Sequence, residues 1–233
     1  MPVNTSVMFS PSTYIKRIFM LALLLLLVAC SCSCGEDPAS NKETPTTGAI
    51  KRDPNVITFV TINSPNTYYI NSDREFSGLE YDLAKAFSKF LGNHKKLEFI
   101  TVDSIQEVVE TLVNNKADIA AADLTITESR KALIDFSVPY QSIHQQVIYN
   151  KVITKKPAKN VSSLIGKEIV VPASSSFVER LKTLQRKQKK IKWIERDGMH
   201  SENILDDVAE GKVEYTIADN HLVSMLQNFH PNL

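Results

Sequence analysis

The sequence predicts an α/β fold in which strands and helices alternate along the chain. Short runs rich in β-branched and aromatic residues recur, and amphipathic segments of helical periodicity separate them. The same order appears twice after residue 53, which favours βαβ units and mainly parallel sheets. With 43% hydrophobic and 23% charged residues over 233 positions, the composition is that of a globular protein with a substantial core.

Residues 1–29 are predicted to be a secretory signal peptide. Lys16 and Arg17 precede the uncharged, leucine-rich run 18–28, and small residues follow it. A basic start, an apolar core of about 7–15 residues and small residues after it define such a signal. The run is too short for a membrane span, which takes about 20 apolar residues.

The signal ends in a pattern that resembles the bacterial lipobox, Leu-Val-Ala-Cys at residues 27–30. The resemblance implies that the Cys30 thiol is lipidated and that the chain is cut just before it. Two or more acyl chains hold a protein stably at a membrane. Ser31 at the next position resembles outer-membrane lipoproteins of Gram-negative bacteria, so we expect a lipid-anchored protein of the cell envelope that faces the periplasm. Residues 30–53, rich in Ser, Thr, Pro and charged residues, are expected to form a flexible tether.

The elements of the folded part follow from periodicity and from turn or capping residues. The expected strands and helices of its first half are strand 56–62, helix 79–91 ending at Gly92, strand 97–102, helix 105–113 and strand 117–125. Ser104 and Glu107 stand in capping-box register before the second of these helices. The second half repeats the order with strand 168–171, a helix opened by Ser174 to Ser176, strand 191–194, helix 203–210 and strand 213–218. Ligands of such folds bind at the carboxyl ends of the strands, so the residues after each strand are candidates for a site.

Two motifs resemble the family 3 bacterial solute-binding proteins. Residues 125–130, Thr-Ile-Thr-Glu-Ser-Arg, and residues 135–140, Asp-Phe-Ser-Val-Pro-Tyr, are similar to consecutive parts of the family pattern, and residues 78–84 resemble its signature. The resemblance implies a two-lobed, type II periplasmic-binding-protein-like fold, with residues 54–145 as the first lobe and 146–233 as the second. It also implies that Arg130 binds the α-carboxylate of an amino-acid-like ligand and that Thr125 assists. A surface ion pair of Arg130 with Glu128 or Asp135 is the alternative.

Further ligand-binding candidates come from the same resemblance. Asp219 ends a segment similar to a second-lobe strand of the family, whose aspartate binds the ligand's α-ammonium, and helix capping is its alternative role. Ser174 and Ser175 begin a helix, where N–H groups and hydroxyls could hold an anion or simply cap and turn the chain. Asp123 stands where the family has a small residue, often glycine, so we expect it to select a basic or amide group or to disfavour simple amino acids.

Much of the chain after the tether also resembles the non-catalytic N-terminal module of the membrane-bound lytic murein transglycosylase F family. Segments around Asn63 and Tyr68, residues 78–87, Ser142 with Gln145 and Gln146, and residues 210–219 carry this resemblance. We also expect Asn63 and Tyr68 to contact the ligand. It implies a module that senses amino acids or cell-wall peptides for a lysozyme-like domain. We therefore expect a C-terminally truncated module, less stable than a completed one, and no catalytic residues within this chain.

Other partners and functions are predicted as follows. The expected partners are a small zwitterionic ligand, the membrane through the lipid anchor, and peptidoglycan. A net charge of +1 argues against nucleic acid. We expect no metal or cofactor, because the histidines are scattered without ligand spacing. The alternatives are the lipoprotein receptor of an amino-acid ABC transporter and an enzyme on the same fold, since a few relatives in the family are dehydratases.

Overall fold

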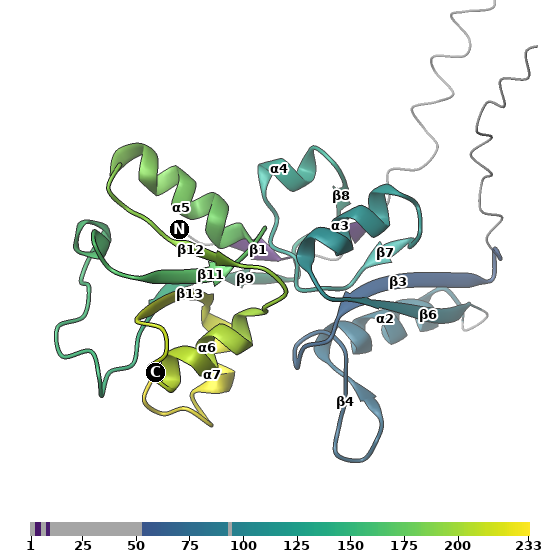
Figure 1. Ribbon diagram of the computed structural model, residues 1–233. Helices are drawn as coiled ribbons and strands as arrows, with labels where there is room; N and C mark the ends of the chain where they lie inside the picture. The colour runs from purple at the N-terminus through teal and green to yellow at the C-terminus, as the bar shows by residue number, and fades with distance from the viewer. Residues whose placement is uncertain (1–2, 6–7, 10–52, 93–94) are drawn as a thin grey trace, which may run out of the picture. The chain divides into compact units, whose positions relative to one another are not determined.

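The computed structural model of the chain describes residues 3–5, 8–9, 53–92 and 95–233 (Figure 1). Two short N-terminal strands and residues 55–233 belong to one compact unit. Cys30, most of the expected signal peptide and nearly all of the expected tether lie outside the described residues. Among the residues that are described, no helix is long and apolar enough to cross a membrane.

The first sheet has five strands in the order β6-β3-β7-β2-β8. Its strands are β3 (Val56–Ile62), β6 (Lys96–Val102), β7 (Ile119–Ala120), β8 (Asp135–Phe136) and β2 (Met8–Phe9). β3 pairs in parallel with β6 and β7, whereas β2 lies antiparallel between β7 and β8. The parallel pairs confirm the βαβ order expected from the sequence.

Helices cover both faces of the first sheet because side chains alternate along β3. Val60 packs with α3 (Ile105–Val113), through Val108 and Leu112. Phe59 packs with Ala84 of α2 (Leu79–Phe90) on the opposite face. We call this sheet, with its helices and the short helix α4 (Glu128–Lys131), the first lobe.

The second sheet has four strands in the order β10-β13-β11-β12. They are β10 (Gln145–Ile148), β11 (Ile169–Pro172), β12 (Ile194–Arg196) and β13 (Tyr215–Asp219). Its apolar faces are covered by α5 (Ser176–Lys187) on one side and by α6 (Ser201–Ala209) with α7 (Asn220–Leu226) on the other. This sheet and its three helices are the second lobe, shown in green and yellow in Figure 1.

The remaining described elements are short. They are β1 (Val3–Thr5) paired with β9 (Gln141–Ile143), the hairpin of β4 (Tyr69–Ile70) and β5 (Phe76–Ser77), and the 3-10 turn η1 (Val161–Leu164).

Most expected elements appear close to their predicted positions, with two differences. The strand expected at 191–194 begins only at Ile194, where pairing with Val170 of β11 starts, and the fully buried Ile191 precedes it in irregular backbone. The run 117–125 contains only the two-residue strand β7, because the chain bends at Asp123, whose φ is 50°. Beyond that bend the chain enters the cleft described next.

Candidate functional site

A cleft of about 400 Å³ lies between the two lobes. Its lining comes from the segments that follow β7, β11 and β13, together with the start of α3 and residues just before α6. Six of the predicted site residues line it: Asp123, Thr125, Arg130, Ser174, Ser175 and Asp219. This position at the carboxyl ends of strands is the one that the α/β topology favours for ligands.

The side chain of Arg130 is buried and spans the two lobes. The residue is only 6% exposed. Nη1 donates to the carbonyl oxygen of Thr125 at 2.9 Å, and Nη2 donates to the carbonyl oxygen of Ser174 in the second lobe at 3.2 Å. Burial lowers the pKa of the guanidinium, while the charges of Glu179 and Asp219 oppose that shift. Arg130 is buried, and among the described residues it forms no ion pair with Glu128 or Asp135.

Asp219 faces the same cleft from the second lobe and lacks a capping bond. It ends β13 and occupies the N-cap position of α7, yet its side chain makes no capping hydrogen bond. Oδ1 is buried and has no hydrogen-bond partner among the described residues. Burial raises the pKa of Asp219 to about 7, the charge of Asp123 adds to this, and His221 and Arg130 oppose it. Among the described residues, one oxygen of this carboxyl group therefore lacks a donor.

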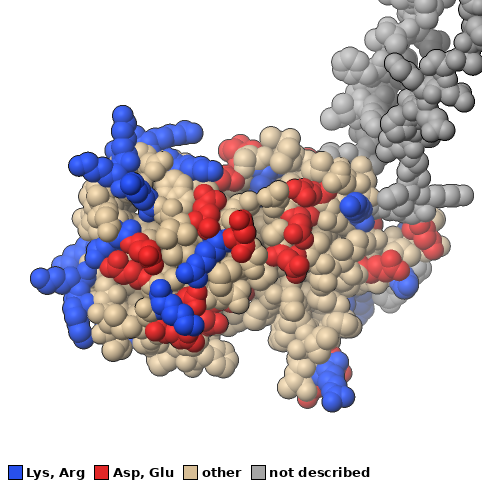
Figure 2. Space-filling model, in the orientation of Figure 1, with Lys and Arg blue, Asp and Glu red and all other residues tan. Residues whose placement is uncertain are grey.

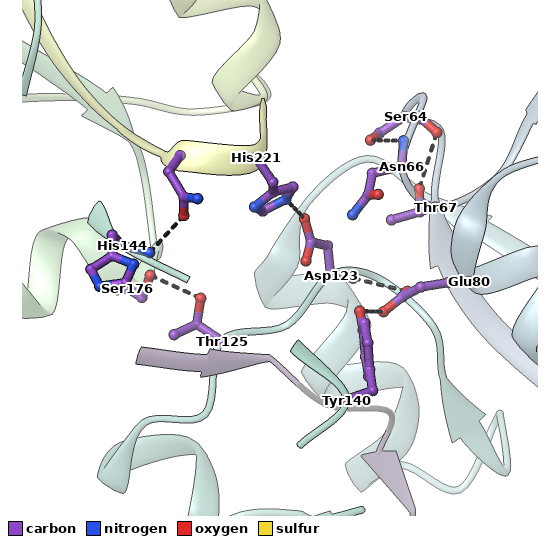
Figure 3. A network of polar contacts seen from close by, with 11 residues as sticks. Ser64, Asn66, Thr67, Glu80, Asp123, Thr125, Tyr140, His144, Ser176 and His221 are labelled. Atoms are coloured by element: carbon purple, nitrogen blue, oxygen red, sulfur yellow. Dashed lines mark hydrogen bonds and ion pairs between the residues drawn. The ribbon is translucent and has the colours of Figure 1, made fainter. Parts of the chain in front are cut away.

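Asp123 connects the lobes through His221. Its Oδ2 lies 2.8 Å from Nε2 of His221, which α7 supplies from the second lobe (Figure 3). Burial alone would lower the pKa of His221, but the hydrogen bond and charge of Asp123 outweigh it and raise that pKa. The backbone of Asp123 is in the left-handed region, which Asp tolerates better than most residues because its short side chain is polar. Its Oδ1 is buried and has no hydrogen-bond partner within the part of the chain that the structure describes.

Glu80 fixes the backbone at Asp123 through a hydrogen bond, as Figure 3 shows. It is 1% exposed; Oε2 accepts the Asp123 N–H at 2.9 Å, and Oε1 accepts the Tyr140 hydroxyl at 2.6 Å. Burial raises the pKa of Glu80 to about 8, and the Asp123 charge adds to the shift. The sequence places Glu80 in the segment 78–84 that resembles the family signature, but nothing in that segment predicts that its carboxyl is buried. The adjacent Gly78 is required, because a Cβ there would collide with the carbonyl oxygen of Thr67.

The serines at the start of α5 contact the other lobe and their own turn. The Ser176 hydroxyl bonds Oγ1 of Thr125 at 3.3 Å, and that of Ser174 bonds Oε1 of Gln106 in the first lobe at 3.3 Å. Ser175 donates to the carbonyl oxygen of Pro172 at 2.7 Å and does not cap α5 with its side chain. Thr125, Ser174 and Ser176 therefore join the lobes directly.

Asn63 and Tyr68 are not among the residues that line the cleft. They form a backbone bridge with each other, and the Tyr68 ring stacks on Phe76 and Phe99, each with a centroid distance of 4.9 Å. Five further acids from both lobes line the cleft and were not predicted as site residues: Asp103, Glu107, Glu110, Asp197 and Glu202. Glu107 had been noted only for its capping register.

The described residues offer no cluster of three or more His, Cys, Asp or Glu side chains that could hold a metal ion. What the cleft provides is a guanidinium from one lobe, carboxylates from both, and hydroxyls between them. Such groups suit a small ligand with a carboxylate and an ammonium.

Comparisons with known proteins agree with this geometry. The model of the bacterial extracellular solute-binding proteins, family 3, matches residues 57–202. A membrane-bound lytic murein transglycosylase F of Methylobacillus flagellatus is 39% identical over 216 residues, which are 93% of this chain and 43% of that protein. The chain thus spans less than half the length of this relative.

Among solved structures, an ancestral arginine-binding protein bound to arginine has 26% sequence identity and a TM-score of 0.65, with 76% of each chain covered. The ancestral arginine-binding protein bound to glutamine has 26% identity and a TM-score of 0.64, covering 78% of this chain and 76% of that one. The fold is accordingly the two-lobed, type II α/β fold of periplasmic binding proteins. The chain belongs to the bacterial extracellular solute-binding proteins of family 3.

Proposed function

We propose that this chain is the ligand-binding, regulatory module of a lytic-transglycosylase-F-like lipoprotein in the cell envelope, and that its ligand is an amino acid or a cell-wall peptide. Arg130 and Thr125 receive the α-carboxylate, Asp219 receives the α-ammonium, and Ser174, Ser175 and Asp123 supply further polar contacts. The observation that carries the proposal is that the buried Arg130 guanidinium and Oδ1 of Asp219, which has no partner among the described residues, belong to the lining of one cleft.

A zwitterion would satisfy both groups at once. A guanidinium binds a carboxylate through two parallel hydrogen bonds, each contributing about 1.5–3 kcal/mol net. An ammonium donates to Oδ1 of Asp219, which otherwise remains buried without a donor. Because burial disfavours the ionised form of Asp219, a neighbouring cation lowers its pKa and stabilises the charged carboxylate.

Ligand binding in this site would favour the closed arrangement of the lobes. The two ends of the ligand meet residues of different lobes, so the closed form makes contacts that an open form loses. A ligand shifts such an equilibrium only by its differential affinity for the two states. In a protein that also carries a transglycosylase domain, this shift would signal the presence of cell-wall peptides to that domain, with the module held at the outer membrane by lipid on Cys30. The match to membrane-bound lytic murein transglycosylase F supports this role.

The proposal is tested by calorimetry on the full chain with amino acids and peptidoglycan stem peptides. Arg130→Ala is expected to weaken binding of the best ligand by more than about tenfold, which corresponds to about 1.4 kcal/mol. Arg180→Ala is the matched control, because Arg180 is exposed on α5 and does not line the cleft. Unchanged affinity of Arg130→Ala for every ligand would reject the site.

A further inference from the structure

The cleft has an excess of negative charge that a simple zwitterion would leave uncompensated. Seven carboxylate side chains line it, against two guanidinium groups. One of these, Arg196, already pairs with Asp207 at 2.5 Å. Figure 2 shows acidic side chains gathered over the middle of the visible face, while Lys and Arg collect over the half that carries α5.

Five of the seven carboxylates are exposed or half-buried and come from both lobes. Among the described residues, none of the five takes part in an ion pair; they are Asp103, Glu107, Glu110, Asp197 and Glu202. Charges of one sign around a cleft raise the local concentration of oppositely charged ligands. These acids would therefore attract cations toward the cleft.

The other two carboxylates, Asp123 and Asp219, each keep one oxygen unpaired in the interior. Asp219 is 6% exposed and the Asp123 side chain is 12% exposed. Oδ1 of both residues is buried without a partner among the described residues. His221 holds Oδ2 of Asp123 but does not itself line the cleft. The α-ammonium of an amino acid can serve Asp219 and leaves Oδ1 of Asp123 without a donor.

We propose that Asp123 determines specificity by receiving a second cationic group of the ligand, so that the cleft selects dibasic amino acids or peptides containing one. This inference rests on the proposed function and names the ligand class of the same site. The left-handed backbone of Asp123 is held by the Glu80 hydrogen bond to its N–H and by His221. A strained residue persists where its surroundings fix it, and such residues cluster at ligand sites.

The same geometry would weaken the binding of an amino acid whose side chain is uncharged. Closing the cleft over an uncharged side chain would bury the Asp123 carboxylate with an oxygen that has no donor, and unsatisfied buried groups weaken binding. A cation at that place satisfies Oδ1 and also offsets the excess charge of the rim acids. The preference should decline with added salt insofar as it depends on the exposed rim, since the Debye length is about 10 Å at 0.1 M.

The test is calorimetry on the full chain with L-lysine and L-norleucine, which have similar shape but differ in the side-chain ammonium. Lysine is expected to bind at least about tenfold more tightly than norleucine to the wild type. In Asp123→Asn the lysine-to-norleucine ratio is expected to fall below about threefold. Asp123→Gly, which suits the positive φ, should lower the ratio equally. Asp82→Asn, an exposed acid outside the cleft, should keep the wild-type ratio.

Equal affinity of the wild type for the two ligands, or an unchanged ratio in both Asp123 variants, would overturn the inference. If norleucine binds and Arg130→Ala abolishes that binding, the proposed function holds even when the lysine preference is absent. If neither ligand binds, the dibasic inference is overturned, and the stem-peptide titration then decides the proposed function separately.

Discussion

Glu80 shows how single residues shape this site at a distance. It is almost completely buried, and among the described residues no cation pairs with it. Its two acceptor oxygens instead fix the Asp123 backbone and the Tyr140 hydroxyl. With a pKa raised to about 8, Glu80 is mostly protonated at neutral pH in the folded protein. The loop that carries Asp123 is thus positioned by a neutral acid.

This protonation has a consequence for stability. In the unfolded chain the carboxyl titrates near its ordinary pKa of 4.5, whereas in the folded state it titrates near about 8. The folded state therefore binds the extra proton between these values, and its contribution to stability is lost as pH rises through that window. Glu80→Gln keeps an acceptor and adds a donor, and it does not titrate. We therefore expect this variant to lack the part of the decrease in unfolding free energy with rising pH that Glu80 causes.

Urea unfolding at about pH 5 and about pH 8 measures the effect. The wild type should lose more unfolding free energy between the two values than Glu80→Gln does. Asp82→Asn, on the exposed face of the same helix, should retain the wild-type dependence. Parallel pH profiles of the wild type and Glu80→Gln would contradict a neutral Glu80.

At the scale of elements, hydrogen bonds between the start of α4 and α5 join the two lobes. The hydroxyls of Thr127 and Ser129, at the start of α4, donate to Oε1 of Glu179 on α5 at 3.1 and 2.6 Å. The same carboxylate attracts the Arg130 guanidinium. The contact joins the two lobes directly.

Removing this contact should favour the open arrangement. We expect Glu179→Ala to increase the radius of gyration of the ligand-free chain in small-angle X-ray scattering, and saturating ligand to reduce the difference. Thr183→Ala is the control, because the Thr183 hydroxyl donates within α5, to the Glu179 carbonyl oxygen at 2.9 Å, and makes no contact with the first lobe among the described residues. Identical radii for the wild type and Glu179→Ala would show that this contact does not hold the lobes closed.

The spacing of apolar residues in the sequence predicted the strands and helices well, because the spacing within a short segment decides which face of that segment is buried. Strand 56–62 and the helices near 79–91 and 105–113 were found because alternating or helical spacing sets which face is buried. The Ser104 side chain accepts the Glu107 N–H at 3.2 Å, as its capping position predicted. Contacts between distant segments could not be predicted: Asp123 meets His221 from 98 residues away and Glu80 from 43. Neither spacing nor composition specifies which side chains fill such a cleft.

At the scale of the whole molecule, the first sheet depends on a strand from the far N-terminus. β2 pairs with both β7 and β8, which are not neighbours of each other in the sheet. β2 lies within residues 1–29, the predicted signal peptide. Processing before Cys30 would remove it and leave the ladder groups of β7 and β8 on that side without partners, and an open strand edge accepts another strand.

A peptide complementation experiment tests this pairing. A chain that begins at Asn55 should have a lower Tm than the same chain with an excess of a peptide of residues 2–10, because the peptide restores the missing ladder. A peptide of the same composition in scrambled order should have no effect. If the two peptides act alike, β2 does not complete the sheet in the way that the structure shows.

The central claim is that Arg130 in one lobe and Asp219 in the other hold opposite ends of one small zwitterion. The most direct measurement is a calorimetric cycle of two proteins, wild type and Asp219→Ala, against two ligands, an amino acid and its analogue without the α-amino group. We predict that losing the amino group weakens wild-type binding by more than about tenfold but hardly affects Asp219→Ala. An equal loss in both proteins would show that the ammonium does not meet Asp219, and would contradict the account.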